Sequence, residues 1–148
     1  ENVAGIVGFA RALEIAHNEK EKINKQIEKL RNYFWTKIQK EIQNVQLNGS
    51  LENRLPNNLN VFFAGLEAEA LMLYLDSYGI LCSTGSACST ESNLPSHVLK
   101  ALGQNDERAN SSIRFTLGKS TKKQDIDYLM KYLPKIVEEL RTIYLPNK

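Results

Sequence analysis

The sequence has little of what small secreted and membrane proteins depend on. Its 148 residues include only two cysteines, Cys82 and Cys88, too few for the disulfide framework of a small secreted domain. It has no apolar run of about 18 residues, the length that spans a bilayer, and no signal-peptide pattern at its N-terminus. These absences predict a cytoplasmic protein with reduced thiols and no membrane contact.

The sequence also lacks a block of one charge and a metal-ligand cluster. The net charge of +2 comes from lysines and glutamates interleaved along the chain, so nucleic-acid binding is not expected. The two histidines and two cysteines fit no closed zinc-site spacing, and we expect no metal. Because the chain runs into a helical pattern without an initial methionine, we interpret it as a segment from within a longer protein.

What is present is a pattern of helices and short strands. Apolar residues at helical spacing predict two helices, or one long bent helix, over the first forty-odd residues. The members of this pattern are Ile6, Phe9, Ala10, Leu13, Ala16, Ile23, Ile27, Leu30, Phe34, Ile38 and Ile42. Strict alternation at Val45 and Leu47, and again over residues 59–63, predicts two short strands.

The second half continues with alternating element types. Residues 67–78 predict a helix that Gly79 ends in a left-handed conformation, and residues 80–82 predict a strand. Residues 83–95 predict a loop, and residues 112–117 a further strand. A short helical turn is expected over residues 98–102 before Gly103.

A long C-terminal helix is expected to complete the fold. Residues 121–124 match a capping box that would open this helix. Its core face comprises Ile126, Leu129, Met130, Leu133, Ile136, Val137, Leu140 and Ile143. The predicted fold is α+β, with a small antiparallel or mixed sheet of three to four strands and helices on one face.

The loop around Cys88 is the one stretch where small polar residues surround a reactive side chain. Such residues leave a thiol room to move, and their hydroxyls can hydrogen-bond a thiolate. The competing interpretation is an exposed cysteine with no role. Cys82, which follows Leu81 in an apolar segment, is expected to pack as a small hydrophobic residue.

Arg114 is the second candidate. It lies between Ile113 and Phe115, so it can be the solvent side of an alternating strand. Arginine is also the side chain best suited to bidentate capture of a carboxylate. The residue type alone does not separate these two interpretations.

Two motifs resemble one enzyme family. The sequence S-T-G-S-A-C-S-T at residues 83–90 resembles the active-site loop of the class I, NifS/IscS-like cysteine desulfurases, and S-S-I-R-F-T-L-G at 111–118 resembles their next strand. The sequences N-V-A-G-I-V-G-F-A at 2–10 and L-P-N-N-L-N at 55–60 are similar to further segments of that family. Lys119 stands where these enzymes commonly carry arginine.

The resemblance implies that residues 1–148 are the C-terminal small domain of a fold-type I transferase that uses pyridoxal 5'-phosphate (PLP). Such an enzyme converts L-cysteine to L-alanine and works as a homodimer. It passes the sulfur to iron–sulfur scaffolds or to tRNA-thiolation proteins. The resemblance implies that Cys88 carries the persulfide and Arg114 holds the substrate carboxylate. The active-site loop would then comprise Ser83, Thr84, Gly85, Ser86, Ala87 and Ser89 around Cys88.

One departure from the family limits what the chain is expected to do by itself. The S-x-H-K motif that carries the PLP lysine in the family does not occur in these residues. PLP is therefore expected on a large domain outside this chain, and the chain alone is expected to be inactive. Two other functions stay open: a noncatalytic sulfur-carrier or docking module, and a thiol-redox protein that uses Cys82 and Cys88.

Overall fold

The computed structural model describes residues 1–85 and 95–144. The helices within these residues are α1 (Val3–Glu41), α2 (Ala68–Ser77), α3 (His97–Ala101), α4 (Asp106–Asn110) and α5 (Lys123–Tyr144). The strands are β1 (Val45–Leu47), β2 (Asn58–Phe63) and β3 (Ser112–Thr116). They form one antiparallel sheet in the order β1-β2-β3, which confirms the predicted α+β class.

The middle strand, β2, separates the two faces of the sheet. Leu59, Val61 and Phe63 are fully buried beneath the helices, whereas the residues between them are only partly buried. Because opposite residues of an antiparallel pair share a face, the register places Asn60 beside Arg114 on the other side of the sheet. The alternation read from the sequence thus sets both the core face and the polar face.

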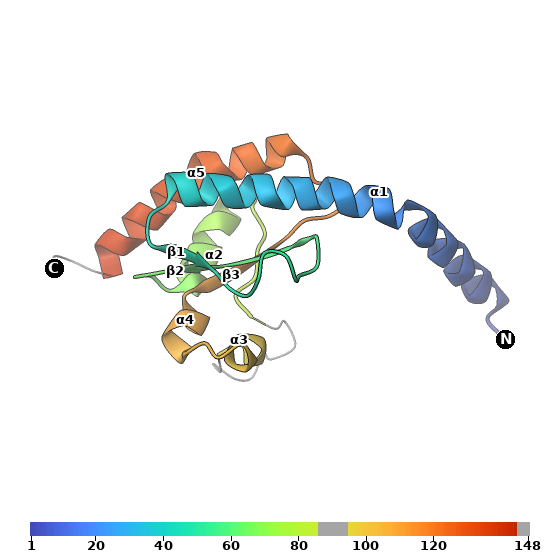
Figure 1. Ribbon diagram of the computed structural model, residues 1–148, viewed down its shortest axis with the longest axis horizontal. Helices are drawn as coiled ribbons and strands as arrows, with labels where there is room; N and C mark the ends of the chain where they lie inside the picture. The colour runs from blue at the N-terminus through green and yellow to red at the C-terminus, as the bar shows by residue number, and fades with distance from the viewer. Residues whose placement is uncertain (86–94, 145–148) are drawn as a thin grey trace.

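Helices α1, α2 and α5 cover the core face of the sheet, while the short helices α3 and α4 lie on the opposite side (Figure 1). The core joins the second half of α1 to the sheet, since the rings of Phe34 and Phe115 form a T-shaped pair with 5.1 Å between their centroids. Seven of the eight residues predicted for the core face of α5 are buried. Ile143 is the exception, because it lies in the last turn and is 62% exposed.

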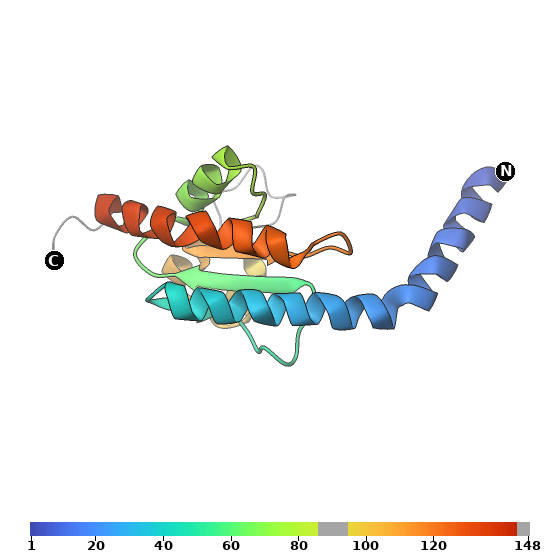
Figure 2. The same cartoon turned by 90° about the horizontal axis from the view of Figure 1, so that it is seen from above.

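The first forty residues form one helix that bends, the second of the two arrangements that the apolar spacing allowed. Figure 2 shows the N-terminal part of α1 turning away from the helices and sheet. The apolar side chains of this part, among them Ile6, Phe9 and Leu13, are therefore exposed. Burial begins only around Ile27.

The strand predicted over residues 80–82 is wrong. Gly79 has a φ of +71°, as the predicted helix end requires, and the amide of Ile80 donates to the carbonyl of Leu75 at 3.0 Å. This bond keeps the start of the segment at the end of α2. Only Ser83 reaches the sheet, through an isolated bridge to Arg114.

The capping box predicted at residues 121–124 is also wrong by one position. The Thr121 hydroxyl accepts from the amide of Gly118 at 2.9 Å instead of from the helix. The carboxylate of Asp125 accepts from the amide of Lys122 at 2.8 Å, so α5 begins at Lys123. The aspartate performs the reciprocal half of the cap that Gln124 was expected to supply.

A carboxylate ties α1 to α5. Asp127 accepts from the hydroxyl of Tyr33 and from the ammonium groups of Lys37 at 3.1 Å and Lys123 at 2.6 Å. Hydrogen bonds, first from Lys123, then from Tyr33 and Lys37, hold the pKa of Asp127 well below its usual range. The folded state therefore favours the ionised carboxylate.

We expect Asp127→Asn to lower the midpoint of thermal unfolding by about 2–4 °C near neutral pH, because it removes this partly exposed network. The folded-state pKa is depressed, so the contribution is fully present above the unfolded pKa of about 4 and is lost progressively as the pH falls from there through the depressed folded-state pKa. Thermal melts from pH 7 to pH 3 measure this. The gap between wild type and variant should narrow below about pH 4 without closing by pH 3, because the depressed folded-state pKa lies lower still. A constant gap would contradict the assignment.

Candidate active site

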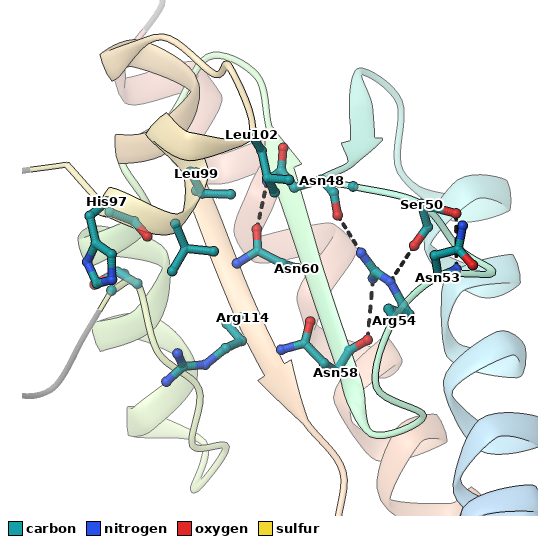
Figure 3. A pocket seen from close by; sticks show the side chains of 15 residues that line it. Asn48, Ser50, Asn53, Arg54, Asn58, Asn60, His97, Leu99, Leu102 and Arg114 are labelled. Carbon is teal, nitrogen blue, oxygen red and sulfur yellow. Dashed lines mark hydrogen bonds between the residues drawn. The ribbon is translucent and has the colours of Figure 1, made fainter.

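A pocket of about 450 Å³ lies on the sheet face opposite the helical core. Its floor is formed by Asn58 and Asn60 of β2 and by Arg114 of β3 (Figure 3). The remaining walls come from the segment after β1, the start of the Cys88 loop and α3. Their residues are Asn48, Gly49, Ser50, Asn53, Arg54, Thr84, Gly85, Ser96, His97, Val98, Leu99 and Leu102.

The backbone fixes Arg114 next to the start of the loop. The amide of Arg114 donates to the carbonyl of Ser83 at 2.7 Å, and the amide of Ser83 donates back to the carbonyl of Arg114 at 3.1 Å. Ser83 also bonds within the loop, from its hydroxyl to the carbonyl of Gly85 at 3.0 Å. The arginine and the first loop residues are thus parts of one local structure.

Arg114 differs from the neighbouring arginine of the pocket. The guanidinium of Arg54 donates to three carbonyls, those of Asn48, Ser50 and Asn58, and so connects the backbone segments that form this wall of the pocket. Within residues 1–85 and 95–144, the Arg114 guanidinium has no such partner, and Figure 3 shows it extending from β3 on the side where His97 lies. Arg114 is therefore the cation left available to a ligand by the described residues.

The lining also determines the charge of the pocket. It includes Arg54 and Arg114, and no aspartate or glutamate occurs among the lining residues that the structure describes. A carboxylate ligand would meet positive charge without competition from protein carboxylates. The structure thereby favours a ligand-binding interpretation of Arg114 over a solvent-facing one.

Asn48 organises the rear of the pocket. It is 2% exposed, and its amide nitrogen donates to Asn60 Oδ1 at 2.7 Å and to the hydroxyl of Ser112 at 2.8 Å. Its own side-chain oxygen accepts from Nε of Arg108 at 2.7 Å. Every polar atom of this amide is engaged, so its orientation is fixed.

The predicted site residues divide into two groups. Ser83, Thr84, Gly85 and Arg114 are brought together at the pocket. The predicted positions Ser86, Ala87, Cys88 and Ser89 lie outside the described residues.

Cys82 lies where it was expected, partly buried against the hydrophobic core. Burial, with a smaller effect from Asp76, raises the pKa of its thiol to about 11. A thiol with this pKa is almost fully protonated near neutral pH and is a poor nucleophile.

The sequence did not single out Asn48, Asn60 or Arg54 as site residues. Asn60 falls within the second predicted strand, and nothing in the local sequence of the three residues indicates a binding role. Among residues 1–85 and 95–144, no group of three His, Cys, Asp or Glu side chains is placed to hold a metal ion. No helix in this part of the chain is long and apolar enough to cross a membrane.

Relatives with known names match almost the whole chain. It is 50% identical over 143 residues to a protein named cysteine desulfurase IscS from Dictyoglomus turgidum, and this alignment covers 97% of this chain and 36% of that protein. It is 43% identical to cysteine desulfurase IscS 1 of Archaeoglobus fulgidus, over 97% of this chain and 37% of the relative. The chain thus spans little more than a third of the length of these relatives.

The chain also matches solved structures of NifS-like proteins and a protein-family model. A NifS-like protein superposes with a TM-score of 0.80 at 34% identity, covering 95% of this chain and 35% of that one. A NifS-like protein from Rickettsia africae gives a TM-score of 0.76 at 28% identity over 93% of this chain and 35% of that protein. The model of the aminotransferase class-V family matches residues 1–129. The chain belongs to the aminotransferase class-V family.

Proposed function

We propose that this chain is the C-terminal small domain, residues 1–148, of a PLP-dependent cysteine desulfurase. In this proposal Arg114 holds the carboxylate of L-cysteine, and Cys88 takes its sulfur. The sulfur moves from Cβ of the substrate to Sγ of Cys88, and the substrate carbon takes up a proton. The products are L-alanine and a persulfide, so no external oxidant is needed.

The observation that carries the proposal is the position of Arg114. Its guanidinium faces a pocket whose described lining residues include no carboxylate, and its backbone is paired with Ser83, the first residue of the motif that contains Cys88. Ser96, near the other end of the loop, lines the same pocket. Both ends of the loop that carries the thiol border this pocket, so a carboxylate bound at Arg114 would lie close to the loop.

The described residues of this chain do not fit PLP itself. Those that line the pocket include no lysine to bond the cofactor aldehyde and no carboxylate to face its ring nitrogen. When bound, PLP supplies the electron sink that allows a bond to Cβ of an amino acid to break. We assign its binding to the part of the protein outside this chain.

The N-terminal half of α1 supports the assignment to a larger enzyme. Its exposed apolar side chains include Val3, Ile6, Val7, Phe9 and Leu13, each at least 59% exposed. Contiguous apolar surface of this kind is typical of a contact with another protein segment. A large domain that carries PLP, in a homodimeric enzyme, would cover it.

We extend the proposal to the delivery of the sulfur and to the location of the protein. As a cysteine desulfurase, the protein would pass its persulfide sulfur to an iron–sulfur scaffold or another thiol acceptor. A persulfide-forming thiol must be reduced before each turnover, which fits the reducing cytoplasm.

The test compares the full-length protein with this chain alone. Supplied with PLP and L-cysteine, the full-length protein should produce alanine and, with a reductant, sulfide. The 148-residue chain should show no turnover above a PLP-only control, because it lacks the lysine motif. Alanine formation by the chain alone, or none by the full-length protein, would contradict the proposal.

A further inference from the structure

A second hydrogen-bond donor lies beside Arg114. Asn60 is the direct cross-strand partner of Arg114, and both side chains lie on the pocket face of the sheet. A carboxylate has two oxygens and accepts several hydrogen bonds, so one guanidinium leaves part of its capacity unused. The question is which end of the Asn60 amide faces the pocket.

The polar network answers this question. Asn60 Oδ1 accepts from Asn48 Nδ2 at 2.7 Å, so the oxygen end of the amide faces the rear wall. The nitrogen end is left for the pocket, and Figure 3 shows it on the open side, where Arg114 and His97 also lie. An amide oriented in this way presents donors and no acceptor to a ligand.

The orientation is set from outside the pocket. Asn48 cannot turn its amide without losing the bonds to Ser112 at 2.8 Å and from Arg108 at 2.7 Å. Arg108 is held in turn by the side chain of Gln46 at 2.6 Å and the carbonyl of Leu47 at 3.1 Å. The contacts run from Arg108 of α4 through Asn48, which directly follows β1, to Asn60 of β2, and they fix the Asn60 amide.

We propose that Asn60 is a second binding residue for the substrate carboxylate, donating from Nδ2 next to Arg114, and that Asn48 is the residue that positions it. This inference rests on the proposed function. It explains why a fully bonded buried asparagine stands behind the pocket. It also predicts that reversing the Asn60 amide is as harmful as removing it.

The first test is Asn60→Asp in the full-length protein. The variant keeps the size of the side chain but places an acceptor and a negative charge where the donor was. KM for L-cysteine should rise about 10- to 150-fold, the range of a lost hydrogen bond to a charged group, while kcat changes less. Asn60→Ser, which removes the amide without adding a charge, should raise KM about 10-fold and serves if the aspartate variant fails to fold.

The second test is Asn48→Asp, which leaves Asn60 itself intact. The introduced carboxylate still accepts from Arg108 but has no hydrogen to donate to Asn60. The Asn60 amide is then expected to turn its nitrogen to the rear wall and its oxygen to the pocket. The buried carboxylate also loses the donor to Ser112, so thermal stability should fall to some extent. At temperatures well below the unfolding midpoint KM should nevertheless rise while kcat changes little, a split that a merely structural role would not give.

Gln43→Glu, on the exposed segment between α1 and β1, is the matched control, since it also turns an amide into a carboxylate but lies outside the pocket. It should leave both constants within twofold of the wild type. If wild type forms alanine but Asn60→Asp and Asn60→Ser leave KM unchanged, the Asn60 assignment is wrong while the proposed function stands. If the wild-type protein forms no alanine at all, both are wrong.

Discussion

In the full-length protein, Cys88→Ala is expected to abolish persulfide formation and alanine production from L-cysteine. The reason is chemical, because alanine has no sulfur to accept the substrate's Sγ and no neighbouring residue of the motif can replace it. Binding of cysteine should survive, since the variant leaves Arg114 and the pocket unchanged. The measurement is labelling with a thiol-reactive probe after a single turnover, followed by peptide mapping.

Cys82→Ala is the matched control for this result. The Cys82 thiol is partly buried against the core, and burial raises its pKa to about 11. We expect the variant to keep most of its activity and to lose about 1 kcal/mol of stability, as when a small buried side chain is shortened. Persulfide label on Cys82, or label that survives in Cys88→Ala, would overturn the assignment of Cys88. It would favour a thiol-redox function instead.

The elements of the core could be predicted because their periodicity is set by burial. The alternation at Leu59, Val61 and Phe63 and the spacing along α5 reproduce the buried faces of β2 and α5. The periodicity of a sequence shows that one face of a helix or strand is apolar, but it does not show which part of the protein covers that face. The apolar side of the N-terminal half of α1 was therefore recognised as helical, while its exposure in this chain was not foreseen.

The errors lie where single hydrogen bonds decide the outcome. Residues 80–82 have strand-forming side chains, but the amide of Ile80 bonds to the end of α2 and only Ser83 pairs with β3. At the start of α5, both Thr121 and Asp125 could cap the helix, and the sequence pattern selected the wrong one. Such choices depend on local geometry that residue type does not specify.

At the candidate site, some residues could be predicted from a sequence motif, whereas others depend on the register of the strands. Cys88 and Arg114 could be proposed from the sequence because their motifs are continuous, whereas Asn48 and Asn60 come together with Ser112 through strand pairing. A one-residue change of register would turn Asn60 to the other face of the sheet. The binding role of Asn60 therefore required the register between β2 and β3.

We expect Arg114→Ala in the full-length protein to raise KM for L-cysteine about 10- to 150-fold. This range corresponds to about 1.5–3 kcal/mol for hydrogen bonds to a charged group. Folding should be little affected, because the contacts of Arg114 with Ser83 are made by the backbone and survive the substitution. Steady-state kinetics of alanine formation, together with thermal melts, measure both effects.

Two further variants separate charge, geometry and structure. Arg114→Lys keeps the positive charge but loses the planar fork, so its KM should lie between those of wild type and Arg114→Ala. Arg141→Ala removes an arginine outside the pocket that donates to the carbonyls of Ala64 at 2.8 Å and Asn44 at 3.2 Å, and it should lower thermal stability without raising KM. An unchanged KM in Arg114→Ala would support the alternative interpretation, in which Arg114 only faces solvent. A raised KM, with stability kept, would place the substrate carboxylate at the bridge between β3 and the start of the Cys88 loop.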